Sequence, residues 1–263
     1  MALSPSDPES RPTYACLAMY PFQPLRPAWD TLWAAVHRSA PWTPATLLWT
    51  DDVHATWTDP NCVVGQACGW PVAALLRDAV EVVGAFTLTV PEARGHRYRS
   101  VLVGRDRRTL LELADAGAVA VANSADSLSG WISFVAAADA AGAGSRWPGE
   151  VVWSGAHIES LRHLQDGRAA VASIDALSLK LIERLYPELV SGLHEIGHGP
   201  LVPSPPVIVP SATPRALIDS LRDALTWAVT DASVADASAE LYIDGFVSLD
   251  HAEYAETLRL VDV

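Results

Sequence analysis

The segment 126–130 reads Asp-Ser-Leu-Ser-Gly and places two hydroxyl groups and a glycine where a helix is expected to begin. It follows an apolar run at 118–122, typical of a buried strand, and precedes a helical pattern at 131–140. The first N–H groups of a helix have no partner within it, so Ser127, Leu128, Ser129 and Gly130 can together surround an anion. The same residues also fit an ordinary helix cap, in which a serine accepts a hydrogen bond from a nearby amide.

Five further polar residues are expected at or beside strand ends, namely Tyr20, Gln66, Tyr98, His157 and Asp175. His157 can donate to an anion oxygen at a helix start, or it is simply an exposed histidine there. Asp175 can accept a hydrogen bond from a protonated ligand oxygen, or it is only a helix cap. Tyr98 can donate its hydroxyl to a ligand where the chain crosses toward a second lobe, or it is a half-buried structural tyrosine.

The segment 194–198 matches the H-E-x-x-H pattern of zinc hydrolases, which works only on a helix. Three glycines and a proline between positions 192 and 200 make a continuous helix unfavourable. The longer metalloprotease form needs a glycine at 201 and a histidine at 204, where this chain has Leu201 and Ser204. We therefore expect a strand returning to the first lobe, and no metal site.

Charge and composition exclude several classes of partner. The 263 residues carry a formal net charge of −13, which argues against binding to nucleic acid or to an anionic membrane. No run approaches the roughly 20 apolar residues that would cross a bilayer, so no membrane insertion is expected. An anionic ligand would therefore have to be held by local dipoles and hydrogen bonds.

The three cysteines predict neither a disulfide framework nor a zinc knuckle, because their number is odd and Cys62 and Cys68 are too far apart. No Walker loop or dinucleotide fingerprint occurs, so no cofactor is expected. The first ten residues have neither a cationic nor an apolar segment of an export signal. We therefore expect a cytoplasmic protein, or a periplasmic one if a leader was removed.

A repeated order of strand, short loop and helix indicates the α/β class, with mostly parallel sheets flanked by helices. The order occurs twice, which predicts two lobes. We expect residues 13–96 together with 191–263 to form the first lobe, 97–190 the second, and 1–12 to be disordered. A cleft between such lobes, at the carboxyl ends of strands, is where α/β proteins bind ligands, so the residues named above should meet there.

The sequence resembles the phosphate, phosphite and phosphonate substrate-binding proteins of ABC transporters, which have the type 2 periplasmic-binding-protein fold. The resemblance extends from about Tyr14 to Phe246. Six segments carry it jointly: Met-Tyr at 19–20, Gln-Ala-Cys-Gly-Trp-Pro at 66–71, Tyr-Arg-Ser at 98–100, the segment 126–130, Ser-Gly-Ala-His at 154–157 with Ser-Leu at 160–161, and 167–175 ending in Ser-Ile-Asp.

This resemblance implies roles for individual residues. In the family the serine-rich turn holds the phosphoryl oxygens, which implies that role for Ser127, Ser129 and Gly130. It likewise implies ligand contacts for the histidine, aspartate and tyrosines named above. Leu128 departs from the family, because a threonine often stands between the two serines. The expected export signal is also absent, so the chain looks like a cytoplasmic member.

The resemblance implies a protein that closes on a small phosphate, phosphite or phosphonate anion. An enzyme on the same scaffold is the alternative, for example a lyase, a dehydratase or a cofactor-biosynthesis enzyme, with His157 and Asp175 as general acid and base. A third possibility is a sensor whose closed form contacts a protein partner that the sequence does not identify.

Overall fold

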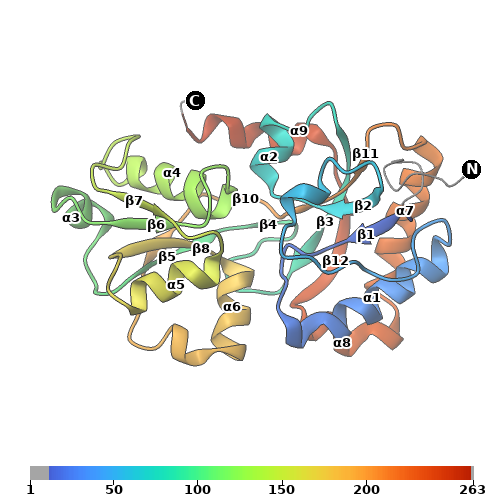
Figure 1. Cartoon of the computed structure of the whole chain (residues 1–263), viewed down its shortest axis with the longest axis horizontal. Coiled ribbons are helices and arrows are strands. Elements are labelled where there is room, and N and C mark those ends of the chain that lie inside the picture. The colour runs from blue at the N-terminus through green and yellow to red at the C-terminus, as the bar shows by residue number, and fades with distance from the viewer. Residues whose placement is uncertain (1–11, 262–263) are drawn as a thin grey trace, which may run out of the picture.

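The computed structural model describes residues 12–261 and divides them between two lobes, each built on a five-stranded sheet flanked by helices (Figure 1). The expected disordered segment 1–12 lies outside the described residues except for Pro12. Within residues 12–261, no helix is both long and apolar enough to cross a membrane.

The sheet of the first lobe has the order β1-β2-β11-β3-β12. Its strands are β1 (Tyr14–Cys16), β2 (Cys62–Gln66), β3 (Val80–Leu88), β11 (Pro206–Pro210) and β12 (Ile243–Ser248). β1 pairs in parallel with β2, whereas β11 and β12 are antiparallel to their neighbours. β3 is buried along nearly its whole length, as expected for a strand covered on both faces.

Five helices belong to the first lobe: α1 (Arg26–Ser39), α2 (Gly69–Ala74), α7 (Arg215–Ala228), α8 (Ala235–Glu240) and α9 (His251–Ala255). α1 contacts α7 and α8, and α2 contacts α9. The buried positions of α1 include Trp29, Leu32, Trp33 and Val36, whose helical spacing makes one apolar face. Trp29 packs edge-on against Phe86 of β3, which joins this helix to the centre of the sheet.

Gly84 allows β3 and β12 to approach closely, and we expect its replacement by alanine to destabilise the protein. A Cβ atom there would lie 2.2 Å from the Val247 carbonyl oxygen and 2.7 Å from the Phe246 ring. Overpacking a closely packed core costs about 1–3 kcal/mol, and backbone must shift here. Urea unfolding of Gly84→Ala measures the loss. Gly65→Ala in β2 is the control, with a smaller expected loss, because its nearest contact would be 3.3 Å; equal losses would contradict the explanation.

The sheet of the second lobe has the order β7-β6-β8-β5-β9. Its strands are β5 (Ser100–Gly104), β6 (Ala120–Ala122), β7 (Val151–Trp153), β8 (Val171–Asp175) and β9 (His194–His198), and its helices are α3 (Leu110–Asp115), α4 (Ser133–Ala140), α5 (His157–Gln165) and α6 (Ala176–Leu185). Side chains alternate between the two faces: Leu102 packs with the α3 and α4 cluster, whereas Val101 and Val103 belong to the cluster that contains α5 and α6.

The expected two-lobed α/β fold is confirmed, with two differences. Both sheets are mixed, because β5, β11 and β12 run antiparallel to their neighbours. β5 and β11 follow the two crossings between the lobes, so they enter their sheets without a preceding crossover helix of the kind that parallel pairing requires. The segment 194–198 is a strand, as expected, but it pairs with β5 in the second sheet and does not return to the first lobe.

The chain crosses between the lobes twice, through β4 (Arg97–Tyr98) and β10 (Val202–Pro203). These segments pair antiparallel and form a two-stranded ribbon between the lobes (Figure 1). Two short linkers of this kind are the usual site of hinge bending in two-lobed proteins.

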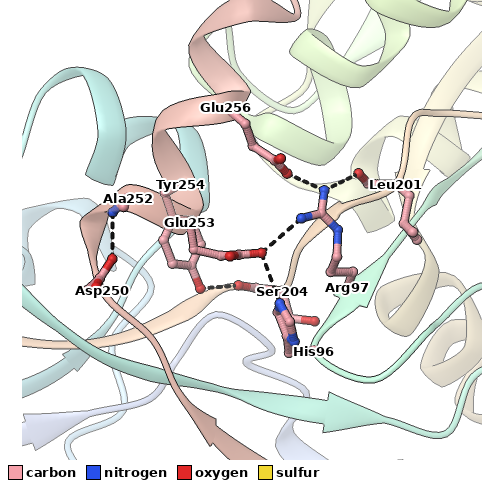
Figure 2. Close-up of polar contacts among 9 residues, drawn as sticks. All are labelled: His96, Arg97, Leu201, Ser204, Asp250, Ala252, Glu253, Tyr254 and Glu256. Atoms are coloured by element: carbon pink, nitrogen blue, oxygen red, sulfur yellow. Dashed lines mark hydrogen bonds and ion pairs between the residues drawn. The ribbon is translucent and has the colours of Figure 1, made fainter.

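The C-terminal segment binds both linkers (Figure 2). The Arg97 guanidinium donates to the Glu253 carboxylate at 2.8 Å and to the Leu201 carbonyl at 2.9 Å, and it also pairs with Glu256. The hydroxyl of the buried Tyr254 donates to the Ser204 carbonyl at 2.8 Å. The segment that contains α9 therefore ties the two crossings to each other and to the first lobe.

Glu253 predicts a pH dependence of stability. A hydrogen bond with His96, together with the charges of His96 and Arg97, holds the pKa of Glu253 below its ordinary value despite partial burial. The unfolded chain then binds more protons than the folded one between the two pKa values, so this stabilisation is full above the unfolded pKa and is lost as pH falls through the folded one. In Glu253→Gln, unfolding free energy should fall less steeply with acidification below about pH 4.3.

Urea titrations across the acidic range test this. Glu240→Gln, at an exposed position at the end of α8, is the matched control. A slope that is equally changed in both variants would contradict the role of the Glu253 contacts.

Candidate functional site

A cavity of about 420 Å³ lies between the lobes and is lined by residues of both. Six of the nine sequence-predicted ligand residues line it: Tyr20, Tyr98, Ser127, Ser129, His157 and Asp175. Five of these residues are buried and His157 is partly buried, so the polar end of the cavity lies deep between the lobes. The positions at strand ends that were inferred from sequence therefore converge in space.

The serine-rich turn is a π-helical turn, Leu128–Ile132, that leads directly into α4. Ser127 caps it, because its Oγ accepts from the Gly130 N–H at 3.0 Å and its carbonyl accepts from Trp131 and Ile132. The Ser129 Oγ lies 3.1 Å from His157 Nε2. Ser127 thus acts as a cap, whereas the Ser129 side chain joins the turn to the histidine.

The three other predicted residues do not line the cavity. Leu128 is buried against the first lobe, where its backbone N–H donates to the Cys68 thiol at 3.2 Å. Gly130 lies against Asn123, because a Cβ atom there would be 1.8 Å from the Asn123 Oδ1. Gln66 lines a small separate pocket beside Tyr20. These residues hold the lobes and the turn together around the cavity.

Asp175 accepts hydrogen bonds from two sides. Its Oδ1 accepts from the Ser178 N–H at 2.8 Å, which caps α6, and its Oδ2 accepts from the Tyr20 hydroxyl at 3.3 Å. Burial, followed by the nearby Asp175 charge, raises the pKa of Tyr20 and of Tyr98 well above the ordinary tyrosine value. Both phenols are therefore neutral and can donate.

His157 is a neutral ring near pH 7. Burial lowers its pKa, and the nearby Asp175 charge opposes this shift only in part. Its Nδ1 is buried and has no hydrogen-bond partner among residues 12–261. Either nitrogen can carry the proton, so the ring can donate to a ligand or accept from Ser129.

No lysine or arginine is among the described residues that line the cavity, although three aspartates are. Positive potential comes instead from helix starts. The first residues of α5, including Ala156, His157 and Ile158, face the cavity, as do Asp175 and Ser178 at the start of α6. With the serine-rich turn, the N-terminal ends of three helical segments in the second lobe contribute residues to the cavity lining, and the dipole at a helix start favours a bound anion.

Sequence reasoning missed several lining residues. Asn123 and Ser124 follow β6 directly, and the same strand-end argument would have identified them. Phe22, Trp57 and Tyr186 also line the cavity, but aromatic residues near an apolar pattern are usually assigned to the core, so the sequence carried no signal for them.

The H-E-x-x-H segment forms β9, so it does not provide the helix on which two histidines four apart share one face. His198 instead pairs with Glu195 at 3.3 Å. The zinc-hydrolase alternative is therefore not supported at this position.

The chain matches, over residues 67–254, the model of a family described as ABC transporter, phosphonate, periplasmic substrate-binding protein. No curated protein sequence matches it significantly. Solved structures show the same fold at low sequence identity. A binding-protein component of an ABC phosphonate transporter from Pseudomonas aeruginosa is 15% identical, with a TM-score of 0.77 over 95% of this chain and 84% of that one.

Two further structures share the fold. PhnD1 from Prochlorococcus marinus, solved with methylphosphonate, is 10% identical, with a TM-score of 0.72 over 95% of this chain and 96% of that one. A Xanthomonas citri protein solved with ATP is 13% identical, with a TM-score of 0.66 over 95% of this chain and 94% of that one.

Proposed function

Because this chain belongs to the family of periplasmic substrate-binding proteins of phosphonate ABC transporters, we propose that it binds an organophosphonate or a similar phosphoryl anion between its lobes. The observation that carries this proposal is the convergence of three helix starts on a buried cavity that also presents Ser129, Tyr98 and His157. Each of these groups can donate a hydrogen bond to an anion, and none of them carries a formal positive charge.

The charge of the cavity selects the protonation state of the ligand. Asp175 lies among the donors, and no basic side chain in the described lining offsets it. A ligand oxygen that keeps its proton can donate to this carboxylate, whereas a bare oxygen would be repelled. A monoanionic phosphonate fits, and inorganic sulfate does not.

The same argument disfavours a polyanion such as the ATP found in the Xanthomonas citri relative. Several neighbouring phosphates require Lys, Arg or a metal ion for neutralisation. The described lining presents one small group of uncharged donors, with no basic side chain to neutralise further phosphates.

Binding would close the lobes about the β4–β10 ribbon. In the structure Leu128 of the second lobe packs against Gly69 and donates to Cys68, both of the first lobe. Opening would separate these contacts and expose the serine-rich turn, and a bound anion would stabilise the closed state.

Binding explains the site better than catalysis. Ser129 and His157 form a pair of the kind that activates a nucleophile, but such a pair needs a third group to orient the histidine. The Nδ1 of His157 has no partner within the described part of the chain. An enzyme role would be supported if a bound phosphonate were chemically changed on incubation.

Thermal unfolding of ligand-free protein with methylphosphonate, phosphate, phosphite and sulfate tests the proposal. A ligand at about 100 times its Kd adds roughly 2.7 kcal/mol to the unfolding free energy. We expect methylphosphonate to stabilise the protein and sulfate to have no effect. If no phosphoryl compound stabilised folded, ligand-free protein, the proposal would be wrong.

Two further measurements test the compartment of the protein and its role in transport or sensing. The description of the family is periplasmic, whereas the sequence predicted a cytoplasmic location, or a periplasmic one if a leader was removed. Fractionation of cells that express the native gene distinguishes the two. Co-purification with a membrane permease would favour transport.

A further inference from the structure

The cavity is larger and less polar than a phosphoryl group requires. Its volume of about 420 Å³ falls in the range of roughly 300–1,000 Å³ that is typical of pockets for drug-sized organic ligands. The polar groups described above occupy its deep end. The remaining lining consists mainly of apolar and aromatic side chains.

Exposure separates the two ends of the cavity. Tyr98 is 1% exposed and Ser129 5% exposed. Phe22 and Tyr186 are half-buried, and Gln23 and His54 are exposed, so these residues lie toward the mouth. A ligand held by its phosphoryl group at the deep end would therefore direct its substituent toward the aromatic residues.

The aromatic residues of the mouth come from both lobes. Phe22 follows β1 in the first lobe, and Tyr186 follows α6 in the second. Their ring centroids are 6.5 Å apart, with the rings tilted by 38°. A substituent held against both rings would gain contacts only when the lobes close, so it would add to the stability of the closed state.

The inner aromatic wall is fixed and apolar. Trp57 is only 7% exposed, and its indole N–H already donates to the Gln66 carbonyl at 3.0 Å. His54 packs against it with a centroid distance of 4.5 Å. With its N–H satisfied, Trp57 can offer a ligand only the apolar surface of its ring.

Charge at the mouth favours a neutral substituent. Lysine and arginine are absent from the described lining, so a second anionic group would find no partner. The carboxylate in this region, Asp51, is exposed to solvent, where an ion pair with a cationic substituent would be weak. Apolar contact is what the mouth offers most.

We propose, on the basis of the proposed function, that the ligand is a phosphonate or phosphate monoester with a bulky, uncharged apolar substituent about the size of an aromatic ring. The substituent lies against Phe22, Trp57 and Tyr186. These three side chains set the preference for the organic part of the ligand, whereas the serine-rich turn binds the phosphoryl part.

Calorimetric titration with phenylphosphonate, methylphosphonate and 2-aminoethylphosphonate tests the inference. Burying the additional ring carbons should make phenylphosphonate bind at least about tenfold more tightly than the other two. Methylphosphonate binding as tightly as phenylphosphonate would overturn the inference and leave the proposed function intact. Tighter binding of the amine would also overturn it, in favour of a cationic substituent. Failure of all three to bind would overturn both.

Two variants locate the effect. Phe22→Ala and Tyr186→Ala should each remove most of the advantage of phenylphosphonate while changing methylphosphonate affinity by less than about threefold. Both side chains are half-buried at the mouth, so folding should survive, and circular dichroism checks this. If each variant weakened both ligands equally, the rings would serve lobe closure alone and the inference would be wrong.

Discussion

Replacing Ser129 by alanine is expected to weaken methylphosphonate binding by roughly 10- to 100-fold. The Ser129 hydroxyl is buried in the cavity, 3.1 Å from His157 Nε2. A hydrogen bond to a charged group contributes about 1.5–3 kcal/mol, and the lost oxygen also leaves the His157 ring without its one described partner. The loss should therefore appear in affinity, with little change in the fold.

Ser133→Ala is the matched control for this variant. Ser133 is fully buried, follows in the next turn of the same helical segment, and does not line the cavity. Its Oγ has no hydrogen-bond partner among residues 12–261, so its removal should leave affinity nearly unchanged. Calorimetry on both variants gives the comparison. Equal losses, or none in Ser129→Ala, would mean that the anion is held elsewhere.

Ser127→Ala should behave differently, because Ser127 caps the π-helical turn. Loss of a cap costs about 1 kcal/mol of stability, and the displaced turn would also weaken binding. Of the two serines, therefore, only the replacement of Ser129 tests the contact with the anion without also displacing the turn.

The location of the site followed from a local rule. Loops after the strands of an α/β sheet gather at one edge, so polar residues just past several apolar runs should meet there. Ser129 after β6, His157 after β7 and Asp175 at the end of β8 obey this rule, and β6 pairs in parallel with both β7 and β8. The prediction therefore did not require knowing which strands pair with one another.

Strand pairing could not be derived in the same way, because it depends on residues far apart in sequence. β9 has the polar pattern of an edge strand, and nothing local indicates that β5 is its partner. The segment 45–49 is apolar and reads as a strand, yet only Leu47 forms an isolated bridge, with Ala15. The packing of the whole lobe decides which apolar segments form inter-strand hydrogen bonds along their full length.

The C-terminal contacts show the same limit. Arg97 and Glu253 are 156 positions apart, and neither belongs to a recognisable motif. The role of α9 at the linkers is visible only once the fold brings them together (Figure 2).

Replacing Asp175 by asparagine is expected to change which protonation state of the ligand binds. The change keeps the size of the side chain, and asparagine caps helices as well as aspartate does, so α6 should persist. Its single amide oxygen can replace Oδ1 at the cap of α6, and its NH2 group then takes the place of Oδ2, where it can donate to the Tyr20 hydroxyl oxygen. What the variant loses is the negative charge that opposes a fully deprotonated anion.

In the wild-type protein, affinity for a phosphoryl ligand should fall as pH rises through the second ionisation of the ligand, near pH 6 for a phosphate monoester. The proton that donates to Asp175 is lost there, and the resulting dianion faces a carboxylate. In Asp175→Asn the amide can donate to the bare oxygen, so this dependence should flatten or reverse. Calorimetry with one ligand on both sides of that ionisation measures the effect.

Sulfate gives the sharper comparison, because it remains a dianion throughout that range. The wild-type protein should reject it, and Asp175→Asn should acquire measurable affinity.

Asp126→Asn is the control, because Asp126 also lines the cavity but accepts from the Ser124 hydroxyl at 2.7 Å and caps no helix. Either substitution removes one negative charge from the cavity lining. If both variants gained affinity for sulfate, the total negative charge of the cavity would be what excludes sulfate. If only Asp175→Asn gained affinity for sulfate, Asp175 would be the residue that requires a protonated ligand oxygen. It is the one carboxylate in the described lining that also binds the Tyr20 hydroxyl and caps α6.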